Sequence, residues 1–193
     1  MPRAKCFDRE EALQKAMKAF WARGYEATSV QDLVDSMGIN RGSLYDTFGD
    51  KHQLFLAALD QYTKKSLSRG SALKQEGNAL EILTDYLYAF MYRTLEDPEK
   101  RGCFITNTTV ERSSYDPECA KVVGEYYGKV EQDIAELIAR GQRDGNIVNN
   151  RDAADLASFF VGVMQGVRVM GKCRPEEKTL RPMVEVALSA IKG

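Results

Sequence analysis

The sequence contains few of the residues on which catalytic and metal sites are usually built. It has one histidine and four cysteines, and no two cysteines form a C-x-x-C pair. Cys6, Cys103, Cys119 and Cys173 are widely spaced, so we expect free thiols rather than a zinc site or a disulfide framework. A Gly-rich phosphate loop, a G-x-S-x-G elbow and a nucleophile-base triad are also missing. These absences argue against an enzyme, a bound metal or a cofactor.

The sequence also lacks long apolar runs and an excess of one charge. Its longest apolar stretch, residues 156–164, is far too short to cross about 30 Å of hydrocarbon. No basic stretch followed by an apolar run and a cleavage site opens the chain, so we expect a cytoplasmic protein with no membrane partner. Lys and Arg number 27 and Asp and Glu 28, for a net charge of -1. Taken alone, that balance argues against a nucleic-acid binder, whose usual footprint is a basic domain.

Helical periodicity runs through almost the whole chain, and no strand or hairpin pattern competes with it. Capping residues and glycines predict three short helices, from Asp8 to Gly24, from Thr28 or Ser29 to Gly38, and from Asn40 to Gly49. Asp50 predicts the start of a longer helix, and the polar, small residues beyond Ser66 predict a bend or loop. Further helices are expected near residues 80–91, 103–112, 117–143, 152–170 and 179–192. We therefore expect an all-α fold.

The second and third short helices are separated only by a turn that contains Gly38. A turn of three to four residues sets two helices at a steep angle and exposes the second, as in a helix-turn-helix. That second helix is polar, and only Leu44 and Phe48 remain to anchor its inner side. The pattern predicts a helix that can enter a DNA major groove.

The stretch from Leu13 to Phe55 resembles the DNA-binding domain of the TetR (tetracycline repressor) family of transcription regulators. The matching residues are Ala16, Phe20, Gly24, Tyr25, Thr28, Ser29, Val30 and Leu33, followed by Gly38-Ile39-Asn40-Arg41-Gly42-Ser43-Leu44-Tyr45, Phe48 and Lys51. One departure is Thr47, where many relatives have histidine or another aromatic residue. The resemblance implies an N-terminal three-helix DNA-binding domain (1–50), a connecting helix (51–70) and a C-terminal helical ligand-binding and dimerisation domain (71–193).

Four residues are candidates for phosphate contacts. Thr28 and Ser29 offer hydroxyls and free N–H groups at a helix start, and Tyr45 and Lys51 offer a phenol and a point charge. The alternative roles are capping for Thr28, core packing for Tyr45 and a solvated charge for Lys51. His52 is expected to be solvated or to neighbour a phosphate.

Base contacts are assigned to the exposed side of the third helix. Arg41 can bond a guanine edge with two hydrogen bonds, and Ser43 can donate or accept; Asn40 and Asp46 are further candidates. Gly42 would let the backbone approach the DNA. An exposed surface or a phosphate contact is the alternative for each of these residues.

The charge distribution removes the objection raised by the net charge. Residues 1–70 hold 11 basic and 9 acidic residues, a net charge of +2, which leaves -3 for the remaining chain. A dimer would double the basic face, and local phosphate contacts determine the salt dependence. We expect a double-stranded, roughly palindromic operator.

The resemblance also implies a homodimer and a small-molecule effector. The helices at 152–170 and 179–192 are the candidate dimer surface, with Gly162 and Gly166 allowing close helix approach; covering their own core is the alternative. Candidate effector contacts, for which core packing is the alternative, are Tyr86, Phe90, Phe104, Asn107, Tyr127, Phe160, Met164, Gln165 and Arg168.

Cys103 is the remaining candidate effector residue. It follows a charged loop and stands at a predicted helix start, where the helix dipole and nearby Lys and Arg lower a thiol pKa. The segment is similar to that of regulators related to the N-ethylmaleimide reductase repressor, in which such a cysteine senses electrophiles or oxidants. A small buried thiol is the alternative.

These observations favour a repressor released from its operator by a small molecule or electrophile. An activator, or an architectural DNA-binding protein without a small effector, is the alternative on the same scaffold. An enzyme that acts on a hydrophobic metabolite has no motif in its support.

Overall fold

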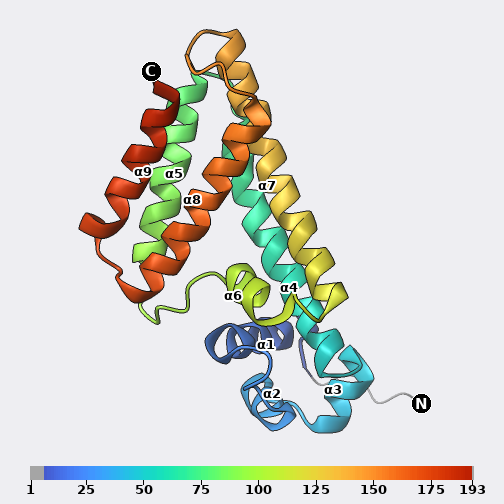
Figure 1. Ribbon diagram of the computed structural model, residues 1–193. Helices are drawn as coiled ribbons and strands as arrows, with labels where there is room; N and C mark the ends of the chain where they lie inside the picture. The colour runs from blue at the N-terminus through green and yellow to red at the C-terminus, as the bar shows by residue number, and fades with distance from the viewer. Residues whose placement is uncertain (1–6, 193) are drawn as a thin grey trace. The chain divides into compact units, whose positions relative to one another are not determined.

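The computed structural model describes residues 7–192 of the chain, so Cys6 lies outside the described residues (Figure 1). Every regular element in that range is helical, which confirms the all-α fold. In chain order the elements are α1 (Arg9–Arg23), α2 (Val30–Met37), α3 (Arg41–Phe48), α4 (Lys51–Ser68), the 3₁₀ helix η1 (Arg69–Lys74), α5 (Ala79–Leu95), α6 (Phe104–Arg112), α7 (Pro117–Arg143), α8 (Ala153–Cys173) and α9 (Glu177–Lys192).

The expected capping side chains make the first three helix starts. Asp8 accepts two backbone N–H groups at the start of α1. The Ser29 hydroxyl accepts the Asp32 N–H at 3.0 Å, and the Asp32 carboxylate accepts the Ser29 N–H at 2.9 Å, which completes a capping box. Asn40 caps α3 by accepting the Ser43 N–H at 2.8 Å. Local sequence chemistry therefore determines where these helices begin.

Two local expectations were wrong. No loop begins directly after Ser66, because α4 continues to Ser68 and η1 follows without a break. The last helix was expected near residues 179–192, but α9 begins at Glu177, so Pro182 lies in its second turn. α4 therefore continues past its expected end, and α9 begins before its expected start.

The chain divides into two compact units, which are described separately. The N-terminal unit comprises the described residues through Lys64 together with Cys103–Val123. The C-terminal unit comprises Lys65–Gly102 and the described residues from Gly124 onward. α6 and the first residues of α7 thus pack with the N-terminal helices, although they lie within the 71–193 segment of the predicted domain division.

Aromatic rings form the centre of the N-terminal unit. The Phe55 ring lies 5.0 Å from the Phe20 ring and 5.5 Å from the Phe104 ring, both edge to face. All three side chains are almost completely buried, as are Leu33 of α2 and Leu44 of α3. α6 therefore contributes to the same core that supports α1, α2 and α3.

In the C-terminal unit, α5, α8 and α9 lie side by side (Figure 1). Their buried side chains join those of the later part of α7 in one hydrophobic core. By length and composition α8 is the one described helix that could cross a membrane, with 28% of the apolar window buried. Phe159 and Val169 on α8 are about half exposed, which leaves one side of this apolar helix uncovered.

Candidate nucleic-acid interface

A left-handed glycine makes the turn between α2 and α3. Gly38 has a φ of 69°, and its N–H donates to the Val34 carbonyl at 3.0 Å. The Ile39 N–H donates to the same carbonyl at 3.2 Å, so the chain leaves α2 sharply and enters α3 at Arg41. This is the predicted helix-turn-helix.

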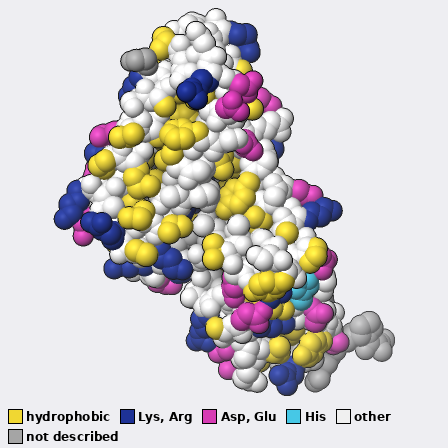
Figure 2. Space-filling model, viewed as in Figure 1, with side chains coloured by type: hydrophobic (Ala, Val, Ile, Leu, Met, Phe, Trp, Pro, Cys, Tyr) yellow, Lys and Arg dark blue, Asp and Glu magenta, His cyan; other side chains and the backbone are white. Residues whose placement is uncertain are grey.

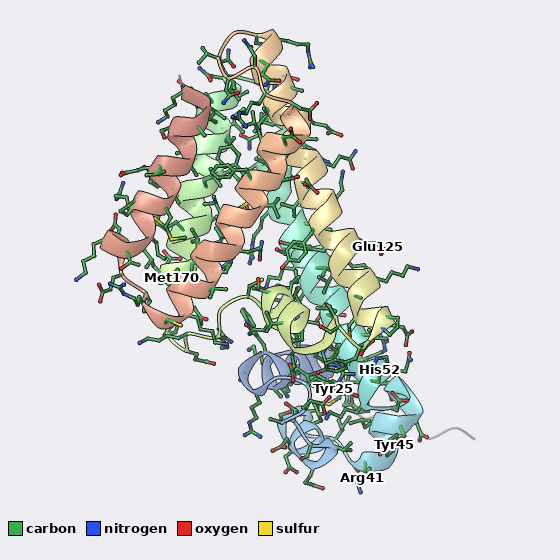
Figure 3. All side chains as sticks on the ribbon, in the orientation of Figure 1. Tyr25, Arg41, Tyr45, His52, Glu125 and Met170 are labelled. Atoms are coloured by element: carbon green, nitrogen blue, oxygen red, sulfur yellow. The ribbon has the colours of Figure 1, made fainter. Side chains whose placement is uncertain are left out.

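α3 presents a polar face on two apolar anchors. Leu44 and Phe48 are buried, as the sequence predicted. Arg41 and Tyr45 are exposed on this helix (Figure 3), and Asp46 is exposed as well. Tyr45 is 46% exposed and is therefore not a core residue, which removes the alternative role considered for it.

Asn40 and Gly42 already have structural roles at the start of α3. The Asn40 side-chain oxygen is used in the cap to Ser43. A Cβ at Gly42 would lie 3.3 Å from that same oxygen, so the glycine makes room for the cap. Ser43 is half-buried, whereas the long side chain of Arg41 is exposed.

At the start of α2 the two hydroxyl residues differ in exposure. Thr28 is fully buried, and its hydroxyl donates to the Gly24 carbonyl at 2.6 Å, so this hydroxyl is not available to a phosphate. Ser29 is exposed and bonds Asp32, which also pairs with Arg23. The hydrogen bonds from Ser29 and then from Arg23 lower the pKa of Asp32 to about 2. A carboxylate therefore stands beside the predicted phosphate site at this helix start.

Lys51, at the start of α4, lies over an aromatic ring. Its Nζ is 4.2 Å from the centre of the Tyr25 ring, and the Arg112 guanidinium lies at the same distance from that ring. Such cation–π contacts hold a cation loosely at a surface. Lys51 is therefore positioned by Tyr25 and is not merely a solvated charge.

His52 belongs to a buried ion-pair network that the sequence analysis missed. Its Nε2 lies 3.0 Å from Oδ2 of Asp116, and Arg112 Nη2 donates to the same oxygen at 2.9 Å. The Asp116 Oδ1 accepts the Cys119 N–H at 3.0 Å at the start of α7. The expectation that His52 is solvated or neighbours a phosphate is therefore wrong. The local sequence could not predict this contact, because Asp116 lies 64 residues away.

Glu111 of α6 fixes the turn between α1 and α2. Its two carboxylate oxygens accept the backbone N–H groups of Tyr25 and Glu26, each at 3.0 Å. A Cβ at Gly24 would lie 2.8 Å from this carboxylate, and Gly24 has a φ of 85°. Gly24 therefore ends α1 and also admits the carboxylate that holds the turn leading into α2.

The described cysteines are free thiols, as expected: Cys103 and Cys119 are buried and Cys173 is exposed. Among the described residues, His52, Asp116 and Cys119 bring three potential metal-ligand atoms within 4.8 Å of one another. Burial and the hydrogen bond to Asp116 raise the pKa of the Cys119 thiol to about 12, however, and a metal ligand must be a thiolate. The carboxylate is also bonded to Arg112, so these residues fit an ion-pair network better than a metal site.

Cys103 occupies the N-cap position of α6 without a side-chain capping hydrogen bond, and it is buried. The Tyr62 hydroxyl donates to its sulfur at 3.8 Å, and the Phe104 ring packs edge to face on Tyr62 at 5.7 Å. The nearby Arg101 pairs with Asp97 at 3.1 Å. Cys103, Phe104 and Asn107 all lie in the N-terminal unit, apart from the other effector candidates.

The seven remaining effector candidates lie in the C-terminal unit. The Tyr127 hydroxyl donates to the Gln165 side-chain oxygen at 3.0 Å. Arg168 lies 4.2 Å from the centre of the Phe90 ring and donates to Thr94 Oγ1 at 2.9 Å. Phe90, Phe160 and Met164 are buried and Tyr86 is half-buried. The structure therefore gathers aromatic, methionine and polar side chains from α5, α7 and α8 in one unit.

Two family models match the chain. Residues 12–58 match the bacterial regulatory proteins of the tetR family, and residues 79–185 match the tetracyclin repressor-like C-terminal domain. The first match contains α2, α3 and the turn between them, and the second spans most of the C-terminal helices.

Curated and solved proteins resemble the chain over nearly its whole length. The repressor ComR of Escherichia coli is 31% identical and the match covers 96% of this chain and 88% of that protein. An uncharacterised regulator of Bacillus subtilis, YezE, is 31% identical, with 99% and 100% covered. A cysteine mutant of the regulator CifR, solved with a 26-bp double-strand operator, has a TM-score of 0.87 and 32% identity, with 98% and 99% covered. The matching models, these relatives and the helix-turn-helix geometry show that the chain belongs to the TetR family of DNA-binding transcriptional regulators.

Proposed function

We propose that the chain is a homodimeric repressor that inserts α3 into the major groove of a palindromic operator and leaves it when a small effector binds. The observation that carries the proposal is the exposed polar face of α3, seated on buried Leu44 and Phe48 behind a tight glycine turn. A rigid anchor with a polar outer face is what base reading requires. An activator would use the same face, because its effect depends on operator position.

Within this interface we assign separate roles to the candidate contacts. Arg41 contacts base edges, with Ser43 and Asp46 beside it, while Tyr45 and Lys51 contact phosphates. The buried Thr28 hydroxyl is omitted. The remaining candidates act through the backbone: Asn40 and Gly42 shape the start of α3, and the N–H groups that follow Ser29 face the phosphate.

We infer that α8 and α9 form the dimer surface. Phe159 and Val169 on α8 and Val186 on α9 are 45%, 50% and 69% exposed. Hydrophobic side chains gather over these two helices in Figure 2. Apart from the glycine itself, its two chain neighbours and the nearby backbone of its own helix, no described atom lies within 4 Å of a Cβ built at Gly162, whereas one at Gly166 would meet Met183 of α9 at 3.1 Å. Gly162 is thus open to a second helix, and Gly166 serves packing within the chain.

The proposed effector site lies in the C-terminal unit. Tyr86, Phe90, Phe160 and Met164 supply apolar surface, and polar contacts come from Tyr127, Gln165 and Arg168 in the site described above. Cys103, Phe104 and Asn107 pack within the N-terminal unit, so we propose a non-covalent effector in preference to covalent sensing at the buried Cys103.

The proposed function also bears on the domain division, the cellular location and the catalytic activity of the chain. We propose the division into a reading domain (1–50), a connecting helix (51–70) and a regulatory domain (71–193), with α6 attached to the reading unit. A chromosomal operator implies a cytoplasmic protein, and the apolar character of α8 then reflects a dimer surface and not a membrane span. We propose no catalytic activity for the chain.

Two substitutions test the assignment on α3 and α4. Arg41→Ala is expected to cost about 1–3 kcal/mol of operator binding and to relax preference at particular base pairs. Lys51→Ala should weaken binding to all sequences alike and reduce the slope of log K against log salt by about 0.9, the value of one phosphate contact. Fluorescence anisotropy over a salt series, with the operator and a set of single-base variants, measures both effects.

Lys64→Ala is the matched control, because Lys64 lies on the same helix about 20 Å further along and pairs with Asp60. It should leave affinity and salt slope unchanged. If Arg41→Ala and Lys51→Ala both behave like this control, the assigned interface is wrong.

A further inference from the structure

Three arginines of the C-terminal unit, Arg69, Arg93 and Arg168, lie close enough to Tyr86 to act on its phenol, and Arg69 and Arg168 both act on Arg93. Arg93 and Arg168 are half-buried and Arg69 is exposed. Among residues 7–192 no carboxylate forms an ion pair with any of these three guanidinium groups. The nearest acidic groups are otherwise engaged or exposed: Asp133 is held by Lys74 at 3.3 Å and Lys129 at 2.9 Å, and Glu96 lies at the exposed end of α5. The cluster therefore has an excess of positive charge.

Helix spacing places two aromatic and two polar side chains on one side of α5. On α5, Tyr86 is followed four, seven and eight residues later by Phe90, Arg93 and Thr94. This spacing places the four side chains on one face of the helix. Arg168 of α8 meets this face, over the Phe90 ring at 4.2 Å and bonded to Thr94 at 2.9 Å. Its guanidinium is thus held in a defined position by neutral groups.

The hydrogen-bonding capacity of these arginines is not used up. The Nε atoms of Arg93 and Arg168 are buried and have no hydrogen-bond partner among the described residues. A buried donor without an acceptor is costly, and a guanidinium is the side chain best suited to bind carboxylate or phosphate oxygens in pairs. An acceptor that carries negative charge would satisfy these donors.

The positive charges of Arg69 and Arg168 repel that of Arg93. Burial lowers the pKa of Arg93, and the charges of Arg69 and Arg168 lower it further. Burial raises the pKa of Tyr86, so its phenol stays neutral and can donate a hydrogen bond. Mutual repulsion of the arginines is relieved when an anion stands between them. Arg168 lies over the Phe90 ring, and Phe90 belongs with Phe160 and Met164 to the buried hydrophobic core of the same unit.

We propose that this cluster binds a small organic anion, whose carboxylate or phosphate head is held by Arg93 and Arg168 and whose apolar part packs on the side chains of α5 and α8. Arg69 attracts the anion from the exposed side. The site is the effector site of the proposed function, so its regulatory consequence depends on that proposal, whereas anion binding itself does not.

Calorimetric titration of the full chain tests the site with four probes: octanoate, octyl phosphate, inorganic phosphate and the neutral octanamide. We expect octanoate or octyl phosphate to bind and octanamide to bind at least about tenfold more weakly. Comparing the two organic anions distinguishes a carboxylate site from a phosphate site. The affinity of inorganic phosphate shows how much of the binding comes from the head group without an apolar part. If none of the anions binds more tightly than about 10 mM, or if octanamide binds equally well, the proposal is wrong.

Substitutions locate the binding. Arg93→Gln and Arg168→Gln should each weaken the anion about 10-fold to 100-fold, whereas Arg143→Gln, which removes an exposed charge of the same unit, should change it less than about twofold. Without probe, Arg93→Gln should unfold at the same temperature as the parent or higher, because a repelling charge is removed. A lower unfolding temperature together with unchanged anion binding would assign Arg93 a structural role and overturn the site.

Operator binding by the same variants, measured without probe, separates the two proposals. Anion binding with no operator binding would refute the proposed function and leave the site standing. Operator binding with no arginine-dependent anion binding would refute the anion site and leave the proposed function standing.

Discussion

Replacing Asp116 with alanine is expected to lower the free energy of unfolding of the N-terminal unit by about 3–5 kcal/mol. Asp116 is 5% exposed and joins His52, Arg112 and the Cys119 N–H. Its removal leaves Arg112, whose side chain is 12% exposed, with only the exposed Glu26 as a carboxylate partner. A buried guanidinium that loses its partner keeps its desolvation cost. Urea denaturation followed by tryptophan fluorescence measures the loss.

The control is Asp60→Ala, which breaks the exposed pair with Lys64 and should change stability by less than about 0.5 kcal/mol. Acid provides an independent check. Burial alone would raise the pKa of Asp116, but the Cys119 N–H and Arg112 outweigh it and hold the pKa well below its ordinary value.

A carboxyl with a depressed pKa stabilises the fold above its unfolded pKa, and this contribution is lost as pH falls through the folded pKa. The parent should therefore lose stability below about pH 4, and Asp116→Ala should lose less over the same range. Equal acid sensitivity, or a loss of less than about 1 kcal/mol at neutral pH, would refute the role assigned to Asp116.

Placing a lysine at Phe159 or at Val186 is expected to convert the protein to a monomer and to reduce operator affinity about 100-fold to 10,000-fold. Both side chains are apolar and exposed on the proposed dimer surface. A charge there would be buried without a partner in the dimer. Two linked heads bind one operator more tightly than a single head does, because the second contact is intramolecular. Sedimentation velocity and anisotropy on the full operator report the two effects.

Val148→Lys is the matched control. Val148 belongs to the same unit, is 55% exposed and lies outside α8 and α9. It should leave both mass and affinity unchanged, and circular dichroism should show full helicity in all variants because every substituted side chain is exposed. A dimer that survives both Phe159→Lys and Val186→Lys would place the interface elsewhere.

The features that the sequence predicted well are those determined by neighbouring residues. Ser29, Asn40 and Gly38 act within four residues of their own positions, so their caps and turn could be read from spacing alone. The two anchors of α3 followed from the same helical period.

The features that were missed depend on contacts between distant segments. Glu111 meets the turn at Tyr25 across 86 residues, and Asp116 meets His52 across 64. A single glutamate or histidine in a polar segment has no periodicity that would mark such a contact. The same holds for Arg93, which reads as a solvated charge on a helix until α8 is placed beside it.

The measurement that tests the central claim most directly is hydroxyl-radical footprinting of the purified protein on the DNA that flanks its own gene. If α3 of each protomer reads a major groove, two protected half-sites related by a dyad should appear about 34–36 Å apart or at multiples of that distance. Protection should fade as salt rises, and it should weaken in Arg41→Ala. Uniform or absent cleavage protection at low salt, with Arg41→Ala indistinguishable from the parent, would contradict the account.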